Sequence, residues 1–356
     1  MPNGDQPGAS LSSSEYLTFG GLAVVEGVMM RSPHHYAVAC RAPNGKIVVK
    51  TEPLAQTWIG RQKWLKKPFL RGTLAMLDTM ALGNRAMNWA ANVQTAPEYQ
   101  VEGSDAAKAT TATSGTKLVE GGIVIATVIA ALVFQFLVFR QLPENVAEII
   151  VRTATNSHKE NILPYVTNYL AEVIKVVLII GFLAAISRVP TMVELFRYHG
   201  AEHKAINTIE AHEDLTIANV NAQTRLHPRC GTNFLIIVTI LAFIIVPAVP
   251  RNLLIPNTSP GWMLALSRLP INLVALPILA GISYEVIRAA GKAKNKAWVN
   301  IILKPGLATQ LITTAEPRDK HLEVAIASLK SVIKAEESGE LTNSTDWTEP
   351  VEDVIT

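Results

Sequence analysis

Apolar and polar positions divide the chain into short alternating runs near its start and long, uniformly apolar runs further on. From residue 19 the alternation has the two-residue period of β-strands, and Asn44-Gly45 is a typical hairpin turn between two such runs. Region 19–97 is therefore predicted to contain a small β-hairpin or meander followed by a helix. The helix follows a basic segment, which favours an interfacial helix on anionic lipid over one packed in a bundle; its basic residues are Lys63, Lys66, Lys67 and Arg71.

Four later runs are apolar enough to be candidate membrane spans. They are residues 121–139, 169–189, 234–249 and 269–287, and the prolines in the last predict a kink. We therefore expect a mainly α, polytopic membrane protein with about four transmembrane helices. A small α+β cytosolic part would be made from the N-terminal segment, the central loop and the C-terminal segment.

The same pattern predicts how the chain is organised. Between the spans and at the ends lie polar, Gly/Ser-rich or acidic segments, which are typical of loops and disordered tails. The expected parts are a disordered N-terminus (1–18), the hairpin and helix region (19–97), a linker (98–117), a four-helix membrane domain (118–290) with a cytosolic loop (190–233), a cytosolic C-terminal segment (291–335) and a disordered acidic tail (336–356).

Composition agrees with a membrane protein. Of the 356 residues, 49% are hydrophobic and 17% charged, and the mean hydropathy is +0.25. The lysines and arginines concentrate before the first span, in loop 190–233 and after the fourth span, which places both termini and that loop in the cytosol and the protein in the inner (plasma) membrane. The first residues lack a basic segment and an apolar core, so we expect no cleaved signal peptide. The lipid bilayer is thus the expected partner.

Two other classes of protein are disfavoured. The two cysteines are too few for a disulfide framework. A net charge of +3 without a basic stripe of interleaved aromatic residues gives no support for nucleic-acid binding. The sequence does not indicate an oligomeric state.

The chemistry is concentrated in loop 190–233, which contains the motif His199-x-x-Glu202-His203. On a helix, residues four apart share a face, so both imidazoles would point the same way with Glu202 beside them. This arrangement suits one divalent metal, with a carboxylate that takes a proton from metal-bound water. The spacing is that of the inverted zinc-protease motif. The alternative is a polar helix at the membrane surface whose histidines bond backbone or lipid head groups.

The predicted topology brings three further candidate ligands to the same side of the membrane. In order of preference they are Glu285, His227 and Cys230, because a carboxylate would complete a catalytic His2Glu set. Glu285 has an alternative role as the ion-pair partner of Arg288. Cys230 has one as a small buried residue ahead of a span.

Other charged residues interrupt apolar stretches and form a further candidate polar site. Glu26 lies in an apolar run, where a structural pair with Arg31 is the favoured interpretation over a functional role. The remaining members of this group are Arg71, Asp78 and Arg229.

Six ordered motifs carry a family resemblance. They are GGLAVVEGVMMRSP, PFLRGTLAMLD, YHGAEHKAINTIE, LHPRCGTNFL, GISYEVIRAAGK and LEVAIASL. From about residue 19 to 329 the chain resembles the YqhQ-like family of bacterial membrane proteins, a domain of unknown function usually described as candidate metal-dependent enzymes. It departs from the family pattern at Ala315, where an Arg is expected. The resemblance implies a polytopic membrane protein with a metal role and supplies no substrate.

The leading hypothesis is a cytosol-facing metal-dependent membrane enzyme, a zinc hydrolase. His199 and His203 would bind the metal and Glu202 would be the general base, acting on a peptide or lipid at the membrane edge. The alternative is a non-enzymatic scaffold or assembly factor in which these polar residues fix the fold. A transporter using Glu285 is disfavoured because the spans are few and show no internal repeat.

Overall fold

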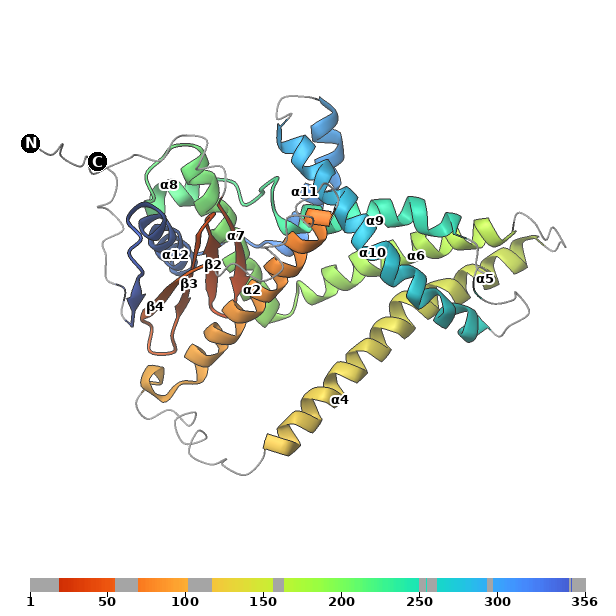
Figure 1. Ribbon diagram of the computed structural model, residues 1–356, viewed down its shortest axis with the longest axis horizontal. Helices are drawn as coiled ribbons and strands as arrows, with labels where there is room; N and C mark the ends of the chain where they lie inside the picture. The colour runs from red at the N-terminus through yellow and green to blue at the C-terminus, as the bar shows by residue number, and fades with distance from the viewer. Residues whose placement is uncertain are drawn as a thin grey trace, which may run out of the picture.

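The computed structural model describes residues 19–54, 70–101, 117–155, 163–249, 261–292 and 297–345, together with 254 and 347. Within these residues the protein is mainly helical, with one small antiparallel sheet. Figure 1 shows the sheet and its covering helices on one side and a set of long helices extending away from them on the other. The predicted N-terminal segment 1–18 and the basic residues Lys63, Lys66 and Lys67 lie outside the described residues.

The predicted meander is confirmed. Strands β1 (Gly20–Val24), β2 (Gly27–Arg31), β3 (His35–Arg41) and β4 (Ile47–Pro53) pair antiparallel in sequence order. The Asn44-Gly45 turn connects the last two, and Gly45 has a φ of 87°, a conformation that glycine adopts without steric cost. A fifth strand, β5 (Asn343–Ser344), pairs with β4 from the far end of the chain.

One face of the sheet packs against helices α7 (Pro190–Glu210) and α12 (Asp319–Ser338), with the short helix α8 (Ile217–Ala222) beside them. Alternate strand residues, including Val28, Met30 and Ala39, enter this core and are fully buried. Helix α12 contributes Leu322, Ile326 and Leu329 to it. The C-terminal helix is therefore a central element of this core.

The other face is covered by α2 (Leu70–Thr95), which buries Leu82, Ala86, Ala90 and Val93 against Val38 and neighbouring strand residues. With both faces covered, the strands are apolar on both sides, as β2 shows. The interfacial interpretation, which rested on the preceding basic residues, is therefore wrong for the half of this helix that follows Leu82, because its apolar side chains pack on the sheet. A short 3-10 turn, η3 (Pro97–Tyr99), ends this segment.

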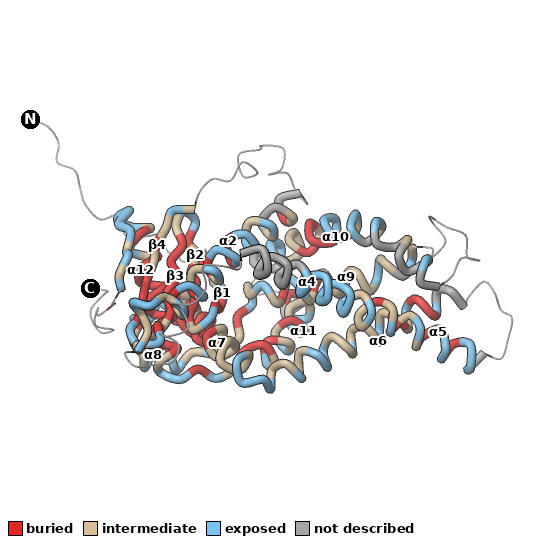
Figure 2. Tube along the Cα trace, turned by 90° about the horizontal axis from the view of Figure 1, so that it is seen from below, coloured by how far each residue is buried: buried red, intermediate tan, exposed pale blue. Residues whose placement is uncertain are grey.

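The extended part consists of helices α4 (Lys117–Phe136), α5 (Leu142–Thr155), α6 (Leu163–Ile186), α9 (Gly231–Ile245), α10 (Gly261–Lys292) and α11 (Ala297–Thr313), with a π turn, η4 (Leu137–Gln141), and a 3-10 turn, η5 (Val246–Ala248). Figure 2 shows that burial concentrates around the sheet and α12, whereas α4, α6 and α9 have few buried residues. Large apolar side chains are exposed on these extended helices, for example Val177 (63%) on α6 and Leu273 (73%) on α10. Such a surface is typical of a protein that contacts lipid or another apolar partner.

Among the described residues, one helical stretch is long and apolar enough to cross a membrane, Val166–Ile186. Gly231–Ile245 and Ile301–Thr313 are apolar but shorter. The structure thus supports one membrane-span candidate, and the four-span topology stays a prediction. Helix α11 continues through Pro305-Gly306 without a break. A Cβ at Gly306 would overlap the Asn233 side chain, so this glycine permits close packing of α11 on α9.

The predicted disordered tail 336–356 begins too early. Helix α12 extends to Ser338, where Gly339 caps it with a φ of 71°. The chain then adds β5 to the sheet, and the Trp347 amide donates to the Ile47 carbonyl at 2.9 Å. The prediction was wrong because it used the acidic composition of this segment, whereas backbone hydrogen bonds order its first part.

Glu336 connects α12 to the turn between β2 and β3. Its carboxylate accepts a hydrogen bond from Ser32 Oγ at 2.6 Å, and the Nδ1 atoms of His34 and His35 lie 2.6 and 3.0 Å from it. Burial opposes ionisation, but these hydrogen bonds lower the pKa of Glu336 from 4.5 to about 2. Because the folded-state pKa is the lower one, the stabilisation is present above pH 4.5 and is lost as the pH falls toward about 2.

We therefore expect Glu336→Gln to reduce the free energy of unfolding near neutral pH by about 1.5–3 kcal/mol, the range for hydrogen bonds to charged groups. The variant should also lose less stability than the wild type on acidification. Thermal unfolding in detergent across pH measures both effects. Glu340→Gln is the control, since that side chain is 64% exposed. Parallel acid curves for wild type and Glu336→Gln would contradict the assignment.

Candidate metal centre

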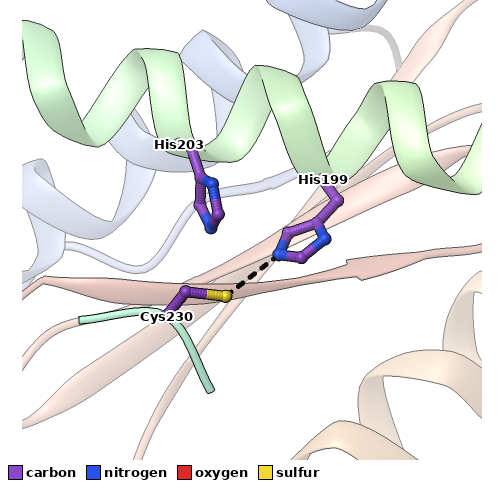
Figure 3. Close-up of side chains that lie close together, drawn as sticks. All are labelled: His199, His203 and Cys230. Carbon is purple, nitrogen blue, oxygen red and sulfur yellow. Dashed lines mark hydrogen bonds between the residues drawn. The ribbon is translucent and has the colours of Figure 1, made fainter. Parts of the chain in front are cut away.

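Helix α7 positions the two motif histidines. It begins with Pro190 directly after the extended Val189, and from Tyr198 onward most of its residues are buried against the sheet and α12. His199 and His203 lie one turn apart on a single face, with ring centroids separated by 4.4 Å. Figure 3 shows both rings directed toward the same side chain, Cys230. The shared face predicted from the spacing is confirmed.

Cys230 precedes α9 as its N-cap residue. Its Sγ lies 3.3 Å from His199 Nε2 (Figure 3). One ligand atom each from His199, His203 and Cys230 lies within 4.8 Å of the other two. Two imidazoles and a thiolate are a ligand set that zinc accepts, and three protein ligands leave a position for water.

The Nδ1 atom of each imidazole contacts a backbone carbonyl oxygen, which holds the ring in place. His199 Nδ1 lies 2.9 Å from the Thr313 carbonyl oxygen, and His203 Nδ1 lies 2.6 Å from the Arg225 carbonyl oxygen. An N–H donated at Nδ1 leaves the Nε2 lone pair of each ring for a ligand, as is usual for metal-binding histidines. The Nε2 atom of His203 is buried and makes no hydrogen bond among the described residues. The pair is therefore oriented for coordination through Nε2.

Close packing holds these carbonyls in place. The Ala315 amide donates to the Phe196 carbonyl at 2.9 Å, and a Cβ at Gly200 would overlap the Ala315 carbonyl oxygen. Segment 313–316 thus runs directly along α7, which a side chain at Gly200 would prevent. Ala315, where the family pattern expects an Arg, lies at this contact.

The surroundings of Cys230 favour its thiolate. Burial raises the pKa of Cys230, but His203 and the hydroxyl and amide of Thr232 outweigh it, so the pKa lies below 9.0. The Thr232 hydroxyl lies 3.3 Å from Sγ at the N-terminus of α9. Helix N-termini and neighbouring imidazoles commonly activate cysteines in this way.

Glu202 interacts electrostatically with His199 and Cys230 but is not one of the three clustered candidate ligands. It is 4% exposed and packs against β1, where a Cβ on Gly21 would lie 2.8 Å from its Cγ and Cδ. Burial raises its pKa to about 8, an effect that His199 opposes and Cys230 reinforces. Its Oε2 has no hydrogen-bond partner among the described residues. A buried carboxylate oxygen of this kind needs a further partner if the group ionises.

The expected order of third ligands is reversed. Glu285 lies on α10, which packs on α2 and α9, and it is not part of the three-residue group around the histidines. His227 lies nearer, with its ring centroid 5.7 Å from that of His203, but its Nε2 lies 3.3 Å from Glu210. Cys230, the last choice from the sequence, lies closest because the site forms where α7 meets the start of α9.

The further candidate polar residues belong to other contacts. Glu26 has a φ of 49° in the β1–β2 turn and accepts a hydrogen bond from Tyr198 at 3.1 Å. The expected pair with Arg31 was wrong, because that residue occupies the opposite end of β2 and bonds Asp78 at 3.3 Å. Arg229 forms an ion pair with Glu210. Arg71 lies in the first turn of α2, and its side chain is outside the described part.

Two contributors to the site left no sequence signal. The carbonyls of Arg225 and Thr313 act through the backbone, which every residue type carries. Gln310 was also missed: its side chain accepts from the His227 amide and donates to the His227 carbonyl, both at 2.9 Å. A glutamine inside an apolar helix was the only hint available for it.

Comparison with known proteins places the chain in a family. The family described as "Protein of unknown function (DUF1385)" matches residues 67–335. The uncharacterised protein YqhQ of Bacillus subtilis (strain 168) is 31% identical over 322 residues, which cover 89% of this chain and 93% of that protein. No solved structure matches the chain. The chain therefore belongs to the YqhQ-like DUF1385 family, whose function is unknown.

Proposed function

We propose that this protein is a metal-dependent enzyme, a zinc hydrolase that acts at the cytosolic face of a membrane. The observation that carries the proposal is the convergence of His199, His203 and Cys230, with ligand atoms within 4.8 Å, while backbone carbonyls fix both imidazoles in the ligating tautomer. Histidines serving only the fold would not need both Nε2 atoms directed at one thiol, where His199 Nε2 already contacts Cys230 Sγ and His203 Nε2 has no partner among the described residues.

Each residue has a role in this proposal. His199, His203 and Cys230 hold the ion, and a bound zinc supplies Lewis-acid activation of water. Glu202 is the general base, since its raised pKa and unpartnered oxygen suit a group that accepts a proton and then releases it. The substrate is a peptide or lipid that approaches from the membrane edge.

The membrane part of the proposal rests on α6 and on the distribution of charge. The span Val166–Ile186 ends four residues before α7 begins at Pro190, so the motif helix follows the membrane helix directly. The basic residues near both termini and in loop 190–233 favour a cytosolic location for the site.

The alternative, a scaffold with a structural polar network, is favoured by the ion pairs that join α7 to α12. Glu194 accepts from Arg197 at 2.9 Å, lies 3.0 Å from His321 Nε2 and also pairs with Lys320. That network is satisfied, whereas Glu202 is not. A buried carboxyl group with an unpartnered oxygen is costly in a purely structural role.

Metal analysis of detergent-purified protein tests the site. The wild type should contain about one zinc per chain, and His203→Ala or Cys230→Ser should lose most of it, because three protein ligands are needed for a stable site. Glu202→Gln should retain the metal and lose hydrolytic activity. Glu285→Gln is the matched control and should keep its metal. No metal in the wild type, or equal metal in Cys230→Ser, refutes the site.

The burial of Glu202 makes a separate prediction for chelator-treated protein. Its folded-state pKa of about 8 exceeds the usual 4.5, so the folded state loses stability as the pH rises through about 8. Glu202→Gln should therefore raise the melting temperature at about pH 9 and change it little at about pH 5. Glu213→Gln, an exposed position beyond the end of α7, is the control. If Glu202→Gln changes the melting temperature equally at both pH values, the raised pKa of Glu202 is contradicted.

Topology is tested with fusions after Thr356. If both termini are cytosolic, green fluorescent protein fused there should fluoresce and alkaline phosphatase fused there should be inactive, because each matures on only one side of the membrane. The fusion protein should also stay in the membrane pellet after an alkaline carbonate wash. Active phosphatase, or release by the wash, would contradict the proposed location.

A further inference from the structure

An apolar groove runs between the membrane-span helix α6 and helices α9 and α11. Its volume is about 510 Å³, and its walls include Val177, Ile180, Ile240, Phe243 and Ala308. The groove also contains Thr239 and Thr309, but their hydroxyls donate to the carbonyls of Leu235 and Pro305, both at 2.9 Å, within their own helices. The groove therefore offers an occupant apolar contact and no free hydroxyl hydrogen.

A more polar pocket of about 410 Å³ adjoins the groove at the end of α6 that leads into α7. The two cavities share Ile312, and their α6 walls continue from Leu183 to Ala184. Arg188 and Arg225 line this second pocket. The apolar groove thus leads to a pocket that two arginines line.

The charges around the pocket leave it positive. Arg188 is exposed, donates to the Ala184 carbonyl and forms no ion pair within the described part of the chain. Glu316 is the one carboxylate among the lining residues, and it pairs with the buried Lys204 and lies 3.9 Å from Arg225. The three positive charges of Lys204, Arg188 and Arg225 therefore outnumber the one negative charge of Glu316.

The pocket also lies next to the metal centre. The Arg225 carbonyl holds His203, and the Thr313 carbonyl that holds His199 belongs to the residue before Thr314, which lines the pocket. Phe196, one helical turn before His199, lines it as well. A group bound between the arginines would lie directly behind the segments that orient both imidazoles.

We infer that the groove and pocket together bind one anionic phospholipid, with an acyl chain between α6, α9 and α11 and the phosphate between Arg188 and Arg225. Charge complementarity selects this occupant, because the basic side chains outnumber the one carboxylate at the pocket. A phosphate adds the missing negative charge and can accept hydrogen bonds from both arginines, whereas an apolar peptide segment would fill the groove and add no charge. The position at the end of a membrane-span candidate is where lipid head groups lie. That this lipid is also the substrate rests on the proposed function, but its binding does not.

Native mass spectrometry of the full chain in detergent tests the inference, with phosphatidylglycerol and phosphatidylcholine as probes. The wild type should retain phosphatidylglycerol about fivefold better, the effect of roughly one effective basic residue. Arg188→Gln should lose this preference. Ala308→Trp, which fills the groove at an exposed position, should lose both lipids. The matched controls are Arg152→Gln, at a side chain 77% exposed on α5, and Ile301→Trp, 71% exposed on α11, and both should behave as the wild type.

Several outcomes would overturn the inference. These are equal retention of the two lipids by the wild type, an unchanged preference in Arg188→Gln, displacement by inorganic phosphate alone, and displacement by an apolar transmembrane peptide. Zinc content measured on the same samples separates the two proposals. Zinc without lipid preference refutes the lipid site alone, whereas lipid preference without zinc refutes the metalloenzyme and leaves the lipid site standing.

Discussion

The burial of α7 between the sheet and helices α8 and α12 is the constraint on which the rest of the structure depends. One side of this helix supplies core residues such as Tyr198, Ala201 and Ile206, while His199 and His203 project from another side toward Cys230. Because the core fixes the rotation of the helix about its axis, it also fixes the direction of both imidazoles. Covering elements from distant parts of the chain, α12 and the N-terminal strands, complete that core.

Backbone groups do much of the positioning within the site. The carbonyls of Thr313 and Arg225 select the tautomers of the two histidines, and the N-terminus of α9 favours the thiolate of Cys230. These three groups come from segments that meet only in the folded protein. The candidate centre is thus rigidly oriented even though only three side chains would contact the ion.

The site also connects the two parts of the molecule. Helix α7 belongs to the core around the sheet, while α9 and α11 lead into the apolar helices. The candidate metal centre lies at this junction, and the groove and basic pocket extend from it along α6.

The sequence by itself determined the strand meander, the Asn44-Gly45 turn, the histidine pair on one helical face and the family, because these depend on local periodicity and short motifs. Only the tertiary structure decided the third candidate ligand, Cys230 instead of Glu285, because that choice depends on which helix ends meet. It also decided that the second half of α2 packs on the sheet and that residues after 336 join it. An apolar stripe suits lipid and protein equally well, and backbone pairing leaves little trace in composition, so neither could be assigned from the sequence.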